Sequence, residues 1–132
     1  MPSSRIRVLT ADDHVDFLTT ARALVDAAPG FETVAEACCG EEAVEAAARH
    51  RPDLVLMDVH MPGIGGIEAA RRILAARPET LLALVSVYAP DDLPAEAWTC
   101  GARAILPKER LRPGVLARLW VSPRSTRPLT RV

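Results

Sequence analysis

The chain has 132 residues, of which 49% are hydrophobic and 25% are charged, and its formal net charge is −1. This length suits one domain with a real core, and the near-neutral charge gives no global reason to bind nucleic acid or an anionic membrane. No apolar stretch approaches the roughly 20 residues of a membrane-spanning helix and no signal peptide opens the sequence, so we expect a cytoplasmic protein.

Strand-like and helix-like segments alternate along the chain. A strand is expected over residues 5–11, followed by a helix over 14–28, where apolar residues recur at three- and four-residue spacing. In chain order there follow a strand at 31–37, a helix at 41–50, a strand at 54–57, a helix at 66–77, a strand at 81–85, a short helix at 94–100, a strand at 102–106 and a last short helix at 113–120. Five βα units in a row favour a parallel sheet with helices on both faces.

The composition changes after the last expected helix. Residues 122–132 contain prolines, arginines and hydroxyl residues without apolar periodicity. We therefore expect one domain over residues 1–121 and a flexible tail or linker stub over 122–132.

Chemically active side chains follow four of the expected strands. Asp12 and Asp13 follow the first, Asp58 directly follows the third, Ser86 follows the fourth, and Lys108 lies just after the fifth. In open α/β sheets the carboxyl ends of the strands form the ligand-binding edge. Clustered carboxylates need a cation, and Mg²⁺ accepts oxygen ligands. An aspartate nucleophile beside Mg²⁺ and a lysine is suited to accept a phosphoryl group.

These motifs resemble a known family. Asp12-Asp13, the segment Leu-Met-Asp58-Val-His-Met-Pro-Gly, Ser86, and Gly-Ala-x-Ala-Ile-Leu-x-Lys108 together resemble the receiver domain of two-component response regulators. Among receivers, the sequence most resembles those that often carry a helix-turn-helix output domain. The resemblance implies a flavodoxin-like, CheY-like (βα)5 fold with strand order 2-1-3-4-5.

The resemblance also implies a role for each site residue. Asp58 would accept a phosphoryl group from a histidine kinase, with Mg²⁺ bound by Asp13, Asp58 and the backbone carbonyl of His60. Asp12 would support the metal from its outer shell. Lys108 and Ser86 would contact the phosphoryl group, and Ser86 would form part of the conformational switch.

The chain departs from the family pattern in the switch and in the last helix. The family usually has an aromatic residue three positions before the lysine, but here that position is Ile105. Proline precedes Lys108 and glutamate follows it, so no cis peptide bond is expected after the lysine. The last helix is expected to be short because Pro113-Gly114 favours a late start and Pro123 an early stop.

Two bulky residues near the site suggest a further hypothesis. His60 and Tyr88 each lie two positions beyond a key residue, Asp58 and Ser86 respectively. Both should line the rim of the pocket where water must approach to hydrolyse an acyl phosphate. We therefore expect their side chains to slow self-hydrolysis.

The resemblance implies a signalling protein with only slow self-dephosphorylation rather than an enzyme. It also implies possible homodimerisation through the face formed by helix four, strand five and helix five, and transcription regulation through a DNA-binding domain absent from this sequence. We expect no direct nucleic acid binding and no membrane contact by this chain. One alternative is an aspartate-dependent phosphohydrolase, although His60 stands where such enzymes need a second acid. The other is a phosphorylation-independent interaction module.

Overall fold

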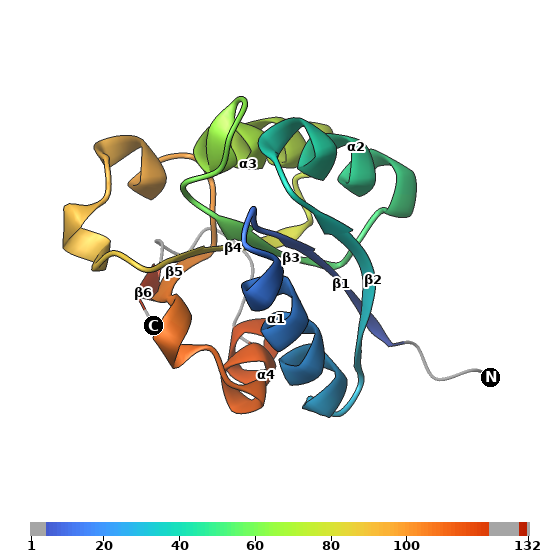
Figure 1. Ribbon diagram of the computed structural model, residues 1–132. Coiled ribbons are helices and arrows are strands. Elements are labelled where there is room, and N and C mark those ends of the chain that lie inside the picture. The colour runs from blue at the N-terminus through green and yellow to red at the C-terminus, as the bar shows by residue number, and fades with distance from the viewer. Residues whose placement is uncertain (1–4, 122–129, 132) are drawn as a thin grey trace.

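The computed structural model of the protein describes residues 5–121 and 130–131. Its centre is a parallel sheet with strand order β2-β1-β3-β4-β5-β6 (Figure 1). The strands are β1 (Ile6–Ala11), β2 (Phe31–Ala37), β3 (Leu54–Asp58), β4 (Leu81–Ser86), β5 (Ala104–Pro107) and β6 (Thr130–Arg131). The order of the first five confirms the expected flavodoxin-like topology.

Two pairs of helices cover the two faces of the sheet (Figure 1). Helices α1 (Val15–Ala27) and α4 (Pro113–Val121) pack on one face, and α2 (Gly40–His50) and α3 (Gly65–Ala76) pack on the other. Each helix buries one apolar stripe, as amphipathic surface helices do; in α1 the buried residues are Leu18, Ala21 and Val25.

Alternate residues of each strand supply two separate hydrophobic cores. In β4, Leu82 and Leu84 join the core under α2 and α3, whereas Ala83 and Val85 join the core under α1 and α4. This period of two is the geometry of a pleated strand. Every residue of β3 is buried, so the strand that ends in Asp58 is fixed on both faces.

The expected short helix at 94–100 forms as a 3₁₀ helix over part of that range and not as an α-helix. The helix in this segment is η2 (Ala95–Trp98), and a second short 3₁₀ helix, η1 (Pro90–Asp92), precedes it. Pro90 and Pro94 lack backbone N–H donors and disfavour helical geometry in the residues before them. With Gly101 at φ +101° closing the segment, too few residues remain to offset the entropy of starting an α-helix.

The final helix is short, as expected, and comprises 9 residues. The structure then differs from the expected tail at Thr130–Arg131, which forms β6 and pairs in parallel with β5. A two-residue polar strand has no sequence pattern that could reveal it. The rest of the expected tail lies outside the described residues, so the domain boundary at residue 121 stays a prediction.

Candidate functional site

Four strand ends meet at one edge of the sheet. Asp12 follows β1 directly, Asp58 is the last residue of β3, Ser86 is the last residue of β4, and Lys108 follows β5. The register pairs Asp58 with Val85 and Ser86 with Pro107, so these ends lie side by side. The structure therefore brings together the side chains that the sequence placed at this edge.

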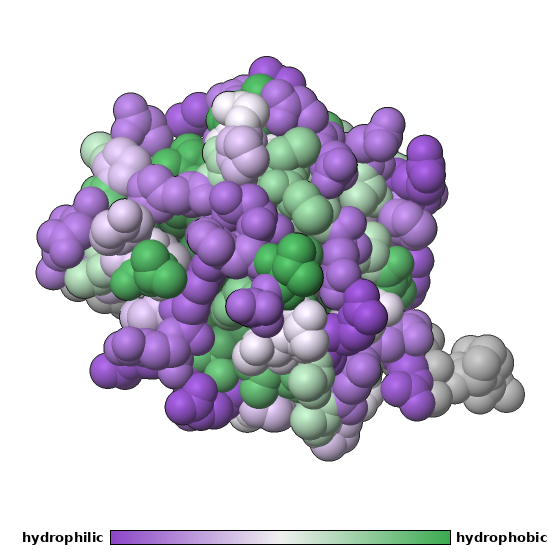
Figure 2. All heavy atoms as spheres, viewed as in Figure 1, coloured by the Kyte–Doolittle hydropathy of each residue, from purple (hydrophilic) through white to green (hydrophobic). Residues whose placement is uncertain are grey.

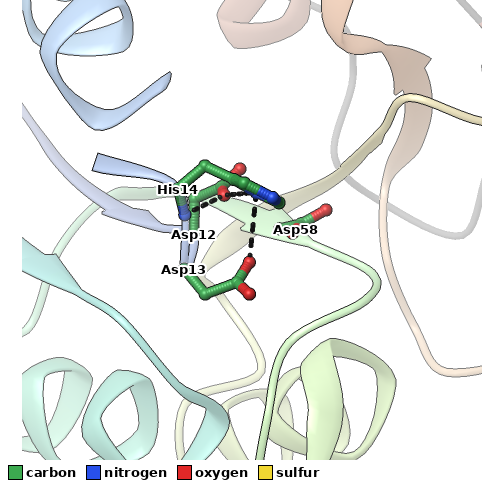
Figure 3. Close-up of side chains that lie close together, drawn as sticks. All are labelled: Asp12, Asp13, His14 and Asp58. Atoms are coloured by element: carbon green, nitrogen blue, oxygen red, sulfur yellow. Dashed lines mark hydrogen bonds and ion pairs between the residues drawn. The ribbon is translucent and has the colours of Figure 1, made fainter. Parts of the chain in front are cut away.

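Three carboxylates and one imidazole form the acidic part of the site (Figure 3). One ligand atom each from Asp12, Asp13, His14 and Asp58 lies within 4.8 Å of the others. Asp12 and Asp58 are buried, whereas Asp13 and His14 are exposed. The cluster thus runs from the interior of the protein to its surface.

The contacts of the His14 ring with Asp12 and Asp13 were not predicted from the sequence. His14 opens the helix expected at 14–28, and it occupies the position before α1. Its Nδ1 also lies 3.0 Å from Asp12 Oδ1 and 3.2 Å from Asp13 Oδ1, while its backbone N–H donates to Asp12 Oδ1 at 2.8 Å. In the sequence, these contacts are indicated only by the fact that Asp12, Asp13 and His14 are consecutive.

Lys108 is the cation of the site. Its Nζ lies 2.5 Å from Asp12 Oδ2 and 3.7 Å from Asp58 Oδ1, and its side chain is only 11% exposed. The same ammonium group lies 4.6 Å from the centre of the Phe17 ring, a favourable cation–π contact from α1. These contacts fix the ammonium group between the two buried carboxylates.

Burial and charge repulsion both act on Asp58. Burial and then the neighbouring Asp12 carboxylate raise the pKa of Asp58 to about 6, with a smaller upward contribution from Asp13. Lys108 and the hydrogen bond donated by the backbone N–H of His60 lower that pKa, but they do not offset the rise. The Asp58 carboxylate is therefore short of positive charge in this arrangement.

The donor set fits a hard divalent cation. Carboxylate oxygens are the preferred ligands of Mg²⁺, and a cation among them would relieve the repulsion that raises the pKa of Asp58. The role of the His60 backbone carbonyl as a Mg²⁺ ligand stays a prediction. His60 donates its backbone N–H to Asp58, and its side chain is exposed.

The loop after β3 is fixed by close packing. The backbone N–H of Gly66 donates to the Val59 carbonyl at 3.1 Å. A Cβ atom on Gly66 would lie 1.8 Å from the Asp58 carbonyl oxygen. Only glycine fits there, so the first turn of α3 can approach the backbone of Asp58.

Ser86 and Tyr88 form the rim of the site on the side of β4. The buried Ser86 hydroxyl accepts a hydrogen bond from the backbone N–H of Tyr88 at 3.0 Å. The Tyr88 ring packs edge-on against the His60 ring, with centroids 4.9 Å apart. Beside them lies an open cavity of about 650 Å³, lined by residues 86–90 and 107–110.

Ile105 is 1% exposed and packs in the core under α2 and α3. It presents no aromatic ring to the surface. Ile105 is therefore a core residue, and its role in the conformational switch stays a prediction.

The family model for the response regulator receiver domain matches residues 8–119. The chain is 41% identical over 105 residues to the response regulator GacA of Pseudomonas aeruginosa, covering 78% of this chain and 48% of that protein. It is 38% identical over 103 residues to the response regulator UvrY of Escherichia coli K12, covering 78% and 47%. The chain therefore belongs to the receiver domains of two-component response regulators.

Solved structures agree with this assignment. A LuxR-family response regulator from Aurantimonas has a TM-score of 0.80 at 28% identity, with 96% of this chain and 89% of that chain covered. The receiver domain of a NarL regulator from Mycobacterium tuberculosis also has a TM-score of 0.80, at 27% identity, with 90% and 99% covered. The expected resemblance to receivers of helix-turn-helix (NarL- and LuxR-type) regulators is confirmed. The comparisons do not support the alternative of a phosphorylation-independent interaction module.

The chain spans about half the length of the curated relatives that it matches. Among residues 5–121 and 130–131, no helix has the length and apolar character needed to cross a bilayer.

Proposed function

We propose that Asp58 accepts a phosphoryl group from the phosphohistidine of a kinase. A carboxylate oxygen of Asp58 attacks phosphorus, so that an O–P bond forms while the N–P bond to the kinase histidine breaks. The observation that carries the proposal is the position of Asp58, buried at a strand end with Lys108 Nζ 3.7 Å away. Attack requires an ionised carboxylate, which a divalent cation in the acidic cluster would favour.

Asp13, Asp58 and the His60 carbonyl would bind Mg²⁺, with Asp12 behind them. When bound, the cation supplies charge neutralisation for the phosphoryl oxygens. Lys108 would neutralise a further phosphoryl oxygen as a point charge, because its ammonium already lies between Asp12 and Asp58. The Ser86 hydroxyl would donate a hydrogen bond to another oxygen.

The Ser86–Tyr88 contact offers a route for the signal to leave the site. If Ser86 turns towards the phosphoryl group, the hydrogen bond from the Tyr88 backbone N–H changes with it. Tyr88 is 53% exposed and lies at the surface cavity beside β5. The switch would then run through the loop after β4, while Ile105 stays in the core.

The output surface is also proposed. The face formed by η2, β5 and α4 corresponds to the expected dimer interface, and Val121 at the end of α4 is 77% exposed. On the face shown in Figure 2, hydrophobic residues form separate spots among hydrophilic ones.

We propose that any homodimer on the output face depends on phosphorylation, and that transcription regulation uses a further DNA-binding domain. The molar mass in solution, measured with and without phosphodonor, tests the dimer.

Incubation with acetyl phosphate and Mg²⁺, followed by intact mass measurement, tests the proposed function. We expect one added phosphoryl group on the wild type, and none on Asp58→Asn or in the presence of a chelator. A receiver should lose the group slowly, with one phosphate released for each group lost, and should not turn over a small phosphomonoester, whereas sustained turnover of such an ester would indicate a phosphohydrolase.

A further inference from the structure

A groove lies between α2 and α3 at the edge of the sheet opposite Asp58. It has a volume of about 250 Å³. Its lining includes Arg51 and Pro52, which precede β3, and Arg77 and Thr80, which precede β4. Because the strands are parallel, these residues lie at the amino ends of β3 and β4, away from the acidic site.

The walls of the groove are apolar. Val44 and Ala47 contribute from α2, and Ile73 and Ala76 contribute from α3. Ala47 and Ile73 also belong to the buried core under these helices, which gives the groove a packed floor. A hydrocarbon group of matching size could therefore lose contact with water there.

The charged residues that line the groove all have the same sign. Arg51, Arg72 and Arg77 line it, and no acidic residue of the described chain does so. Arg72 Nε lies 3.0 Å from Glu68 and Arg77 Nη2 lies 3.4 Å from Glu79, but both glutamates stand outside the lining. The groove thus favours an anion.

Two buried polar groups at the groove lack a hydrogen-bond partner among the described residues. Thr80 is 8% exposed and its Oγ1 forms no hydrogen bond. The Nε of Arg77 is also buried and unbonded. Both groups can donate a proton, and a buried donor without an acceptor destabilises the protein. An oxyanion in the groove could accept from both.

We propose that this groove binds a small organic oxyanion, a carboxylate or phosphate group with an apolar body of a few carbon atoms. The arginines and the two free donors would bind the charged group, and the helix walls would bind the hydrocarbon. The volume equals that of about eight water molecules in the liquid, which limits the ligand to a small molecule. This site is independent of the chemistry at Asp58.

An NMR titration of the full ¹⁵N-labelled chain tests the site with four probes: hexanoate, hexyl phosphate, inorganic phosphate and hexanol. We expect hexanoate or hexyl phosphate to produce saturable shifts at Arg51, Ile73 and Arg77, with a Kd of about 1 mM. The stronger of the two identifies the anionic group. Inorganic phosphate and hexanol should bind at least about tenfold more weakly, because each lacks half of the recognition. Equal binding of hexanol, or no saturable shift with any anion, would overturn the proposal.

Matched variants locate the binding. Arg71 and Arg72 both contact Glu68 at 3.0 Å, but only Arg72 lines the groove. Arg72→Gln should weaken the best probe about fivefold, and Arg71→Gln should leave its affinity unchanged. Thr80→Val should also weaken it, whereas Thr80→Ser should retain it. Equal effects of the two arginine variants would refute the site, and unchanged phosphorylation of each variant by acetyl phosphate would show that the receiver chemistry is intact.

Discussion

The ammonium group of Lys108 lies closer to Asp12 than to Asp58, at 2.5 Å against 3.7 Å. In this arrangement the lysine mainly compensates the fully buried Asp12. Asp58 receives the smaller share of that positive charge, in keeping with its raised pKa. Lys108 therefore neutralises the buried charge of Asp12, and Asp58 is left as the group that gains most from a further cation.

Removal of Lys108 should destabilise the protein. Lys108→Met would leave Asp12 buried without a positive partner, and the loss of one member of a buried pair costs about 3 kcal/mol. Urea unfolding in the presence of a chelator measures this loss. In the double variant Asp12→Asn/Lys108→Met most of the stability should return; simple addition of the two single effects would show that the pair is not coupled.

Stability should depend on pH through Asp58. The folded pKa of about 6 lies above the ordinary value of 3.8, so the folded state binds this proton more tightly than the unfolded state. The resulting stabilisation is complete below about pH 4 and is lost as the pH rises through about 6. The difference of about two units between the folded and unfolded pKa values of Asp58 corresponds to about 3 kcal/mol of stability.

Asp58→Asn, which resembles the protonated acid, isolates this effect. Without metal, the variant should be more stable than the wild type by up to about 3 kcal/mol at pH 8, and by little below pH 4. Urea unfolding at several pH values, with the variant as reference, cancels the titration of the other carboxylates. A stability difference that does not change with pH would contradict the raised pKa.

The packed rings of His60 and Tyr88 should protect the acyl phosphate from water. Tyr88→Ala or His60→Gly removes one ring of the pair and should accelerate dephosphorylation by about tenfold, a barrier change of about 1.4 kcal/mol. The decay of phosphorylated protein after removal of the phosphodonor gives the rate. Tyr88→Phe keeps the ring and should decay like the wild type; unchanged decay in both truncated variants would refute the protective role.

Gly66 should resist substitution because α3 approaches the backbone of Asp58 there. Gly66→Ala places a Cβ 1.8 Å from the Asp58 carbonyl oxygen and should destabilise the protein by several kcal/mol or displace the loop. Gly114→Ala in the first turn of α4 is the matched control, since no atom lies within 4 Å of its Cβ. It should be neutral or stabilising by up to about 1 kcal/mol. Similar thermal midpoints for both variants would contradict this packing.

The sequence predicted the sheet order, and it predicted that Asp12, Asp58, Ser86 and Lys108 lie at the carboxyl ends of the strands, because both follow from strong local patterns. β3 is a continuous apolar run, and the side chains at the strand ends must meet once the strands are parallel. It did not predict the 3₁₀ geometry at 90–98, which arises because Pro90 and Pro94 remove backbone N–H donors and restrict the residues before them. Nor did it reveal β6, whose two residues depend on pairing with β5, or the His14 contacts, which depend on ring orientation.

Chemical localisation of the phosphoryl group tests the central claim most directly. Borohydride reduction of the phosphorylated protein converts an aspartyl phosphate to homoserine, which tandem mass spectrometry of the peptides can locate. We predict homoserine at residue 58 and unmodified aspartate at residues 12 and 13. Homoserine at Asp12 or Asp13, or phosphorylation that yields none at residue 58, would contradict the account.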